Sequence, residues 1–97
     1  MKKLTIDNQE LINKLEALGF ETGSRSELLA YMLRTGMLPS DPSFQAYHKE
    51  YQEFFVQYEA AKAEFERKYV MPLLKDGQKV SWNLDYSARE LTIQGID

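Results

Sequence analysis

The stretch MKKLTIDNQELINKLEALGFETGSRSELLAYMLRTG, residues 1–36, sets the pattern of this chain. It begins with alternating polar and apolar side chains over Lys3–Asp7, which place Leu4 and Ile6 on one face of an extended backbone. Directly after Asp7, apolar residues recur at helical spacing. Residues 1–36 therefore predict a short strand that leads directly into helical structure, with Leu4 and Ile6 on its buried face.

Two capping signals divide the helical part of this stretch. Asp7 with Glu10, and later Ser24 with Glu27, each form a capping box, in which side chains satisfy the free amide groups at a helix start. The second box places a helix start at Ser24, so the sequence predicts two short helices.

Glycines supply the expected helix ends. Gly19 can adopt the left-handed conformation that stops a helix, with Phe20 packing back on Leu15, and Thr22-Gly23 is an alternative stop. Gly36 is expected to end the second helix. The unit 1–36 is thus interpreted as strand, helix and helix.

A third, longer helix is predicted over residues 42–71. Asp41 can cap it and Pro42 suits its first position. Aromatic and small residues recur along it at alternating steps of three and four, and we call this set the aromatic seam: Phe44, Tyr47, Tyr51, Phe54, Tyr58, Ala61 and Phe65. Two interpretations of the seam stay open: the helix lies across its own domain, or it pairs with a second chain.

Residues 79–94 predict a β-hairpin with one apolar face. Val80, Trp82 and Leu84 alternate with polar residues, and Leu91 and Ile93 resume the alternation. Two strands alone are marginal in water, so the Trp82 face is expected to pack on a helix. The predicted fold is a single α+β domain over 1–97.

Composition limits the possible function. The 97 residues are 43% hydrophobic, lack cysteine and carry a net charge of −3, which weighs against broad nonspecific binding to nucleic acid. No apolar run approaches the roughly 20 residues that span a bilayer. We expect a cytoplasmic protein of bacterial or phage origin that does not contact a membrane.

Little in the sequence predicts catalysis. His48 is the single histidine, and acid–base, nucleophilic or metal chemistry normally requires a second, correctly placed group. No spacing of His, Asp or Glu nominates ligands, and no glycine-rich loop suits a phosphate. We therefore expect no enzyme, no catalytic residue, no metal site and no cofactor.

Residues 1–36 resemble the ribbon-helix-helix family of DNA-binding proteins, in which strands from two chains form a ribbon that enters the major groove. The resemblance rests on the strand Lys3–Asp7, the helix Glu10–Leu18 and the segment Glu21–Leu29. It implies a dimeric transcriptional regulator or antitoxin-type repressor with a C-terminal dimerisation or partner-binding extension. By that likeness the base-reading residues are Lys3 and Thr5, and the phosphate-facing residues are Ser24, Arg25 and Ser26.

The competing hypothesis is a non-enzymatic adaptor or inhibitor, encoded by a phage or mobile element, that binds a larger protein. The long helix and the hairpin would form the binding surface, because acidic positions and excess aromatic surface suit a partner's groove. The candidate residues are Tyr51, Phe55 and Tyr58. A homodimer is the expected state, and the adaptor hypothesis also allows a monomer or a dimer formed through the long helix.

Overall fold

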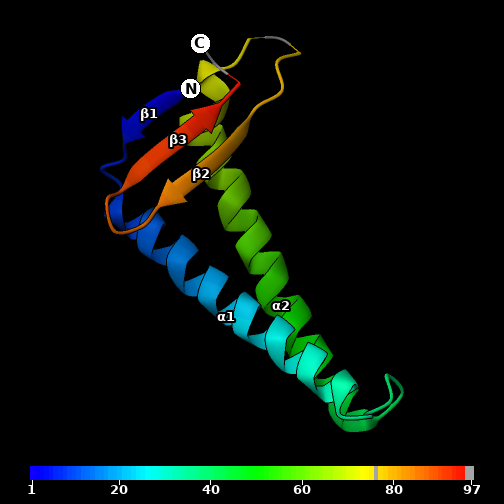
Figure 1. The fold of residues 1–97 in the computed structure, drawn as a ribbon. Coiled ribbons are helices and arrows are strands. Elements are labelled where there is room, and N and C mark those ends of the chain that lie inside the picture. The colour runs from blue at the N-terminus through cyan, green and yellow to red at the C-terminus, as the bar shows by residue number, and fades with distance from the viewer. Residues whose placement is uncertain (76, 96–97) are drawn as a thin grey trace. The chain divides into compact units, whose positions relative to one another are not determined.

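The computed structural model describes residues 1–75 and 77–95 and has the expected α+β fold (Figure 1). Its elements are, in chain order, β1 (Lys2–Thr5), α1 (Gln9–Arg34), α2 (Pro42–Phe65), a π-helical turn (Glu66–Val70), a 3-10 turn (Met71–Leu73), β2 (Ser81–Asp85) and β3 (Glu90–Gln94). They form two compact units. We call residues 17–60 the helical hairpin, and the remaining described residues the sheet unit.

The sheet unit contains an antiparallel sheet in the order β1-β3-β2 (Figure 1). Leu4 pairs in register with Leu91, and Leu84 pairs with Leu91 from the other side. Leu91 is fully buried, Leu4 is half-buried and Ile6, just after β1, is buried, so the predicted inner face is confirmed. The first strand therefore pairs within its own chain, with the C-terminal hairpin.

The predicted packing of Trp82 on the long helix is confirmed within the sheet unit. The Trp82 ring stacks on Phe65 of α2 with centroids 5.0 Å apart, and its Nε1–H donates to Glu66 Oε1 at 2.9 Å. Phe65 is fully buried. The indole thus buries its apolar body while its polar edge keeps a partner, as a buried tryptophan requires.

The prediction of two short helices within 1–36 is wrong, because α1 runs without a break from Gln9 to Arg34. The residue that caps its start is Asn8 rather than Asp7: Asn8 Oδ1 accepts a hydrogen bond from the Leu11 N–H at 3.1 Å. Gly19 and Gly23 lie inside the helix. Phe20 does not pack back on Leu15 in a helix end and is instead 70% exposed.

The predicted end of this helix at Gly36 is confirmed. Gly36 has a φ of +96°, its N–H donates to the Leu33 carbonyl at 3.2 Å, and the Met37 N–H donates to the Met32 carbonyl at 3.1 Å. This pair of bonds defines a Schellman end, which favours glycine because of the left-handed backbone. Met37 packs against the buried cluster that Met32 forms with Leu29 and Phe44.

The start of α2 agrees with the prediction from the sequence. Asp41 Oδ1 accepts a hydrogen bond from the Ser43 N–H at 2.8 Å, and Pro42 is the first residue of the helix. The helical path predicted over 42–71 is present, but only its first part is α-helical. From Glu66 it continues as the π-helical turn and then the 3-10 turn.

The helical hairpin has a small interior. Leu29 and Met32 of α1 and Phe44 of α2 form a buried cluster, with Tyr51 packed against it. Gly19 lies against Tyr58: a Cβ built on Gly19 would be 3.4 Å from Tyr58 Cε1. Helices joined by a short connection pack in this antiparallel way when each offers an apolar stripe.

Candidate partner-binding surface on the helical hairpin

Arg25 holds the two helices of the hairpin together. Its Nη2–H and Nε–H donate to Glu50 Oε1 of α2 at 2.7 and 2.9 Å, and its Nη1–H donates to Glu21 one turn earlier. The guanidinium also lies over the Phe54 ring, with Cζ 4.0 Å from the centroid. We call this set the Arg25 clamp. It uses both charge and ring stacking, which an arginine combines better than a lysine.

The Arg25 clamp affects the expected DNA site. The hydrogen bond with Glu21, followed by that with Glu50, raises the pKa of Arg25 further above its already high ordinary value, so the charged guanidinium is engaged by two carboxylates. A guanidinium in this position is largely neutralised. The interpretation of Arg25 as a phosphate-facing residue stays a prediction, and in this arrangement its donors face the hairpin's own acids.

The other candidate DNA contacts are also placed differently from the expectation. Ser24 and Ser26 lie in the middle of α1, where backbone amides bond within the helix and provide no free helix start for a phosphate. Lys3 and Thr5 are exposed on β1, as expected, but β1 pairs with β3, and Lys3 Nζ lies 3.9 Å from Glu90 Oε1.

Exposed apolar side chains concentrate on the helical hairpin. In the described part of the chain ten large hydrophobic side chains are exposed, and eight of them lie in residues 17–60. These eight are Phe20, Leu28, Tyr31, Leu33, Leu38, Tyr47, Phe55 and Val56. Scattered exposed hydrophobics are ordinary, but such a concentration on a small unit is typical of an interaction surface.

The candidate partner-binding residues form part of a row of rings on α2. Phe44, His48, Tyr51 and Phe55 follow one another with centroids 6.0, 6.2 and 5.9 Å apart. Phe55 is 42% exposed at the end of this row, whereas Tyr51 is half-buried. Tyr58, also half-buried, lies against Gly19. Of the three, only Phe55 is open to a partner, and Tyr51 supports its ring.

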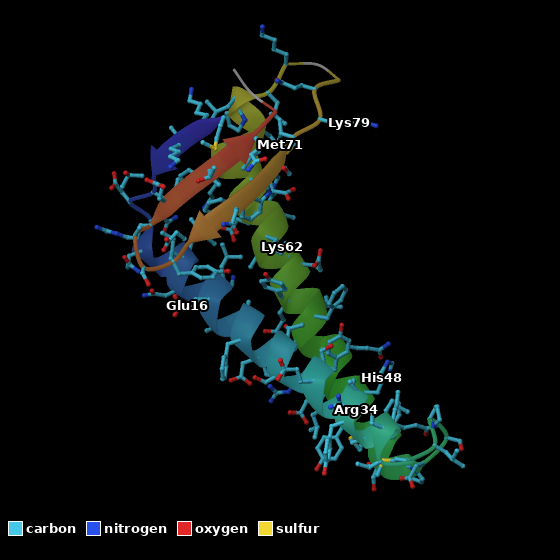
Figure 2. The ribbon with its side chains drawn as sticks, in the orientation of Figure 1. Glu16, Arg34, His48, Lys62, Met71 and Lys79 are labelled. Carbon is cyan, nitrogen blue, oxygen red and sulfur yellow. The ribbon has the colours of Figure 1, made fainter. Side chains whose placement is uncertain are left out.

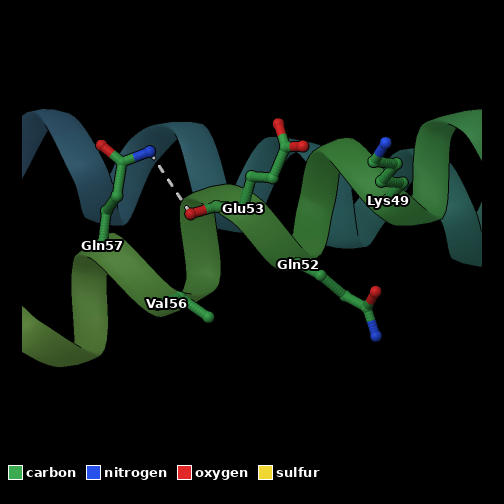
Figure 3. A pocket seen from close by; sticks show the side chains of 5 residues that line it. All are labelled: Lys49, Gln52, Glu53, Val56 and Gln57. Atoms are coloured by element: carbon green, nitrogen blue, oxygen red, sulfur yellow. Dashed lines mark hydrogen bonds between the residues drawn. The ribbon is translucent and has the colours of Figure 1, made fainter.

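The outer side of α2 carries two shallow hollows. One, of about 490 Å³, is lined by Lys49, Gln52, Glu53, Val56 and Gln57 (Figure 3). The second, of about 380 Å³, is lined by Pro39, Phe44, Gln45, His48, Lys49 and Gln52. Because Lys49 and Gln52 border both, the hollows follow each other along the helix. We call them, with Phe55, the α2 surface.

Val56 is the central residue of the α2 surface that the sequence did not single out. It is 65% exposed, and Figure 3 shows it pointing away from the helix beside Gln52. Gln57 Nε2–H donates to the Glu53 carbonyl at 3.3 Å on the same face. Val56 lies outside the aromatic seam, and an apolar residue isolated among glutamines and glutamates was the signal that could have identified it.

Charge is distributed unevenly between the two units. Residues 17–60 contain six acidic and three basic residues, while the rest of the chain contains nine of each, so the net charge of −3 belongs to the hairpin. Within the hairpin, residues 17–34 are balanced, with two acids and two bases. Residues 42–60 have Glu50, Glu53 and Glu59 against Lys49. The acidic excess therefore lies on the α2 side.

Other kinds of site find little support in the described residues. Within 1–75 and 77–95, no three His, Asp or Glu side chains gather where they could hold a metal ion. His48 is exposed on α2 in the row of rings (Figure 2). None of the helices in these residues is both long and apolar enough to cross a membrane.

Comparison of the chain with models of protein families, with curated proteins and with solved structures finds no match.

Proposed function

We propose that this protein is a non-enzymatic protein-binding module, an adaptor or inhibitor, that engages a larger partner through the α2 surface. The observation that carries the proposal is the concentration of eight exposed large hydrophobics on the unit that also carries the whole net negative charge. A unit that needed only to fold would bury such side chains, since each fully buried one stabilises by roughly 1.5–3 kcal/mol.

The chemistry of the α2 surface defines the kind of partner. Val56 and Phe55 offer apolar contact, and three glutamine amides offer hydrogen bonds around them. Glu53 and Glu59 add negative charge. The matching partner surface is an apolar patch with basic residues at its edge, because complementary charge speeds association and selects partners.

The same observations favour the adaptor over the DNA-binding alternative. The Arg25 clamp engages the one cation expected at a phosphate, and the acidic side of the hairpin would repel DNA. The polar face of the sheet carries Lys3 near Glu90 and is not strongly basic. Under this proposal the C-terminal half of the chain, which the DNA-binding hypothesis left as an extension, provides the functional surface.

Affinity capture with the full-length chain tests the proposal. The wild-type protein and a Phe55→Ser/Val56→Ser variant are used as baits in lysate of the source organism, and the captured protein is then purified and its affinity for each bait measured. Loss of two central apolar contacts should weaken binding by at least tenfold, as for interface residues that contribute more than about 1.4 kcal/mol.

Phe20→Ser is the matched control. Phe20 is about as exposed as Val56 but lies on α1, outside the α2 surface, so this variant should retain the partner. Circular dichroism must show the same helix content for all baits. Equal loss of the partner in the Phe20→Ser variant, or full retention in the double variant, would contradict the proposal.

A further inference from the structure

The continuity of α1 creates a surface that the predicted pair of short helices would not have. Because the helix passes through Gly19 and Gly23, Phe20, Ser24, Leu28 and Tyr31 lie at intervals of four, four and three along one side of it. Phe20 is 70% exposed, Tyr31 57% and Leu28 40%. We call this side, together with Glu27, the α1 stripe.

The α1 stripe is turned away from the interior of the hairpin. Leu29 and Met32, which face α2 in the buried cluster, lie on the opposite and adjacent sides of the same turns. Phe20 and Tyr31 are the two aromatic ends of the stripe, and between them are Ser24 and Glu27, both exposed. The two rings are eleven positions apart in the sequence, or about 16 Å along the helix.

We propose that the α1 stripe is a homodimerisation surface, on which α1 of a second copy packs antiparallel so that Phe20 of each copy contacts Tyr31 of the other. An isologous interface must be complementary to itself when its ends are exchanged. The stripe meets this condition, because it has one aromatic ring at each end and a small residue, Ser24, near its midpoint. In the same register Ser24 of one copy lies opposite Glu27 of the other.

Charge on α1 favours a second copy over a charged partner. Residues 17–34 have two acids and two bases, so this part of α1 carries no net charge, and in the proposed register the two Glu27 carboxylates are the like charges that lie near the two-fold axis. Glu21 and Arg25 are already engaged by the Arg25 clamp. A strongly basic partner would instead be drawn to the α2 side, where the acidic excess lies. The α2 surface thus suits a basic partner, whereas the α1 stripe suits a second copy of the chain.

The size of the stripe sets the strength of the dimer. A stable interface buries about 800 Å² on each partner, and three side chains over three helical turns supply less than that. The edge-to-face or offset contact of Phe20 with Tyr31 adds to the burial. The dimer is therefore reversible and concentration-dependent rather than permanent. It is independent of the α2 surface and does not rest on the proposed partner.

Sedimentation equilibrium of the full-length chain from about 1 μM to 1 mM tests this inference, a range chosen because weak interfaces dissociate within it. The wild type is expected to pass from monomer to dimer. Phe20→Lys and Tyr31→Glu, each measured alone, should weaken self-association at least tenfold, because each removes a ring from both symmetry-related Phe20–Tyr31 contacts and the apolar burial that goes with it. Val56→Lys, an equally drastic change on α2, should leave it unchanged.

Mixing the two charged variants tests the antiparallel register. In an equimolar mixture of Phe20→Lys and Tyr31→Glu, one aromatic pair is intact and the other becomes an ion pair between the introduced lysine and the introduced glutamate, so association should recover most of the loss. A wild type that stays monomeric throughout the range overturns the inference. So does a mixture no better than its components, or a dimer that Val56→Lys disrupts and Phe20→Lys does not. Circular dichroism verifies that each variant is folded.

Discussion

The sheet unit and the helical hairpin differ in how far their large apolar side chains are buried. In the sheet unit Phe65, Leu91 and Ile93 are fully buried, and its described exposed large hydrophobics are Met1 and Met71. In the hairpin four residues are buried, one of them the polar Thr22, and eight large hydrophobics are exposed. The difference teaches that the sheet unit places its large apolar side chains inside, whereas the hairpin leaves most of its own accessible.

A matched pair of phenylalanine substitutions gives the largest expected effect. Phe65→Ala removes a fully buried ring that stacks on Trp82 and Tyr69, and should lower the free energy of unfolding by about 3–5 kcal/mol. Phe55→Ala removes a 42% exposed ring of the hairpin and should cost less than about 1 kcal/mol. Urea denaturation measures both. Equal losses would show that the hairpin's aromatic rings contribute to stability as the buried ones do.

The Arg25 clamp gives the next effect, and it should be confined to one unit. Arg25→Met leaves Glu21 and Glu50 without their cation and removes the contact with Phe54, so the melting temperature should fall, though less than for Phe65→Ala. Hydrogen exchange should quicken for amides of residues 17–34 and stay unchanged at Leu91 and Ile93. Arg34→Met, at an exposed position, is the control. An equal increase in the hydrogen-exchange rates of both units would contradict the expectation that the effect is confined to the hairpin.

Thr22 offers a smaller effect of opposite sign. Its hydroxyl is buried in α1 and, in the described structure, has no hydrogen-bond partner. Thr22→Val keeps the shape of the side chain and removes the unpaired group, so it should stabilise the hairpin by about 1 kcal/mol. Thr35→Val is the control, since Thr35 Oγ1 donates to the Met32 carbonyl at 2.9 Å and its loss should destabilise. Thermal unfolding distinguishes the two signs.

The smallest effect concerns acid sensitivity in the sheet unit. The hydrogen bond and the positive charge of Lys68 lower the pKa of Glu64 from its ordinary 4.5. A carboxyl with a lower pKa in the folded state contributes stability above pH about 4.5, and this is lost as the pH falls through the folded pKa. Glu64→Gln should flatten the decline of the melting temperature in that acid range, and Lys68→Gln should flatten it less, because the charges of Lys14 and Arg67 also lower the pKa of Glu64. A decline that persists in both variants would exclude this pair as its cause.

The parts of the fold that short-range signals control were predictable. Gly36 and Pro42 act on the backbone within one or two residues, so the hairpin turn followed from local conformational preference. The alternation over 81–94 likewise predicted β2 and β3, since one face of a strand must be buried. Of the proposed surfaces, Phe55 was named from the sequence as a partner-binding candidate, while Val56 and Phe20 were not.

The helix boundary predicted at Ser24 is absent because local capping and tertiary interactions compete, and the tertiary interactions are stronger. A capping box is worth only about 1 kcal/mol. Against it stand the continuous hydrogen bonds of a 26-residue helix, the contact of Tyr58 with Gly19 and the Arg25 clamp to Glu50, none of which is local in sequence. The same continuity places Phe20 in line with Tyr31.

The sequence by itself thus determined the α+β class, the end of α1 at Gly36, the start of α2 at Pro42 and the C-terminal hairpin of β2 and β3. Each of these depends on residues within a few positions of one another. Only the tertiary structure decided that β1 pairs with β3, near the opposite end of the chain, and that Arg25 faces Glu50 rather than an external phosphate. Pairings of this kind depend on which distant groups meet in space. Because of these two pairings, the function is proposed from the surface of the helical hairpin and not from the N-terminal strand.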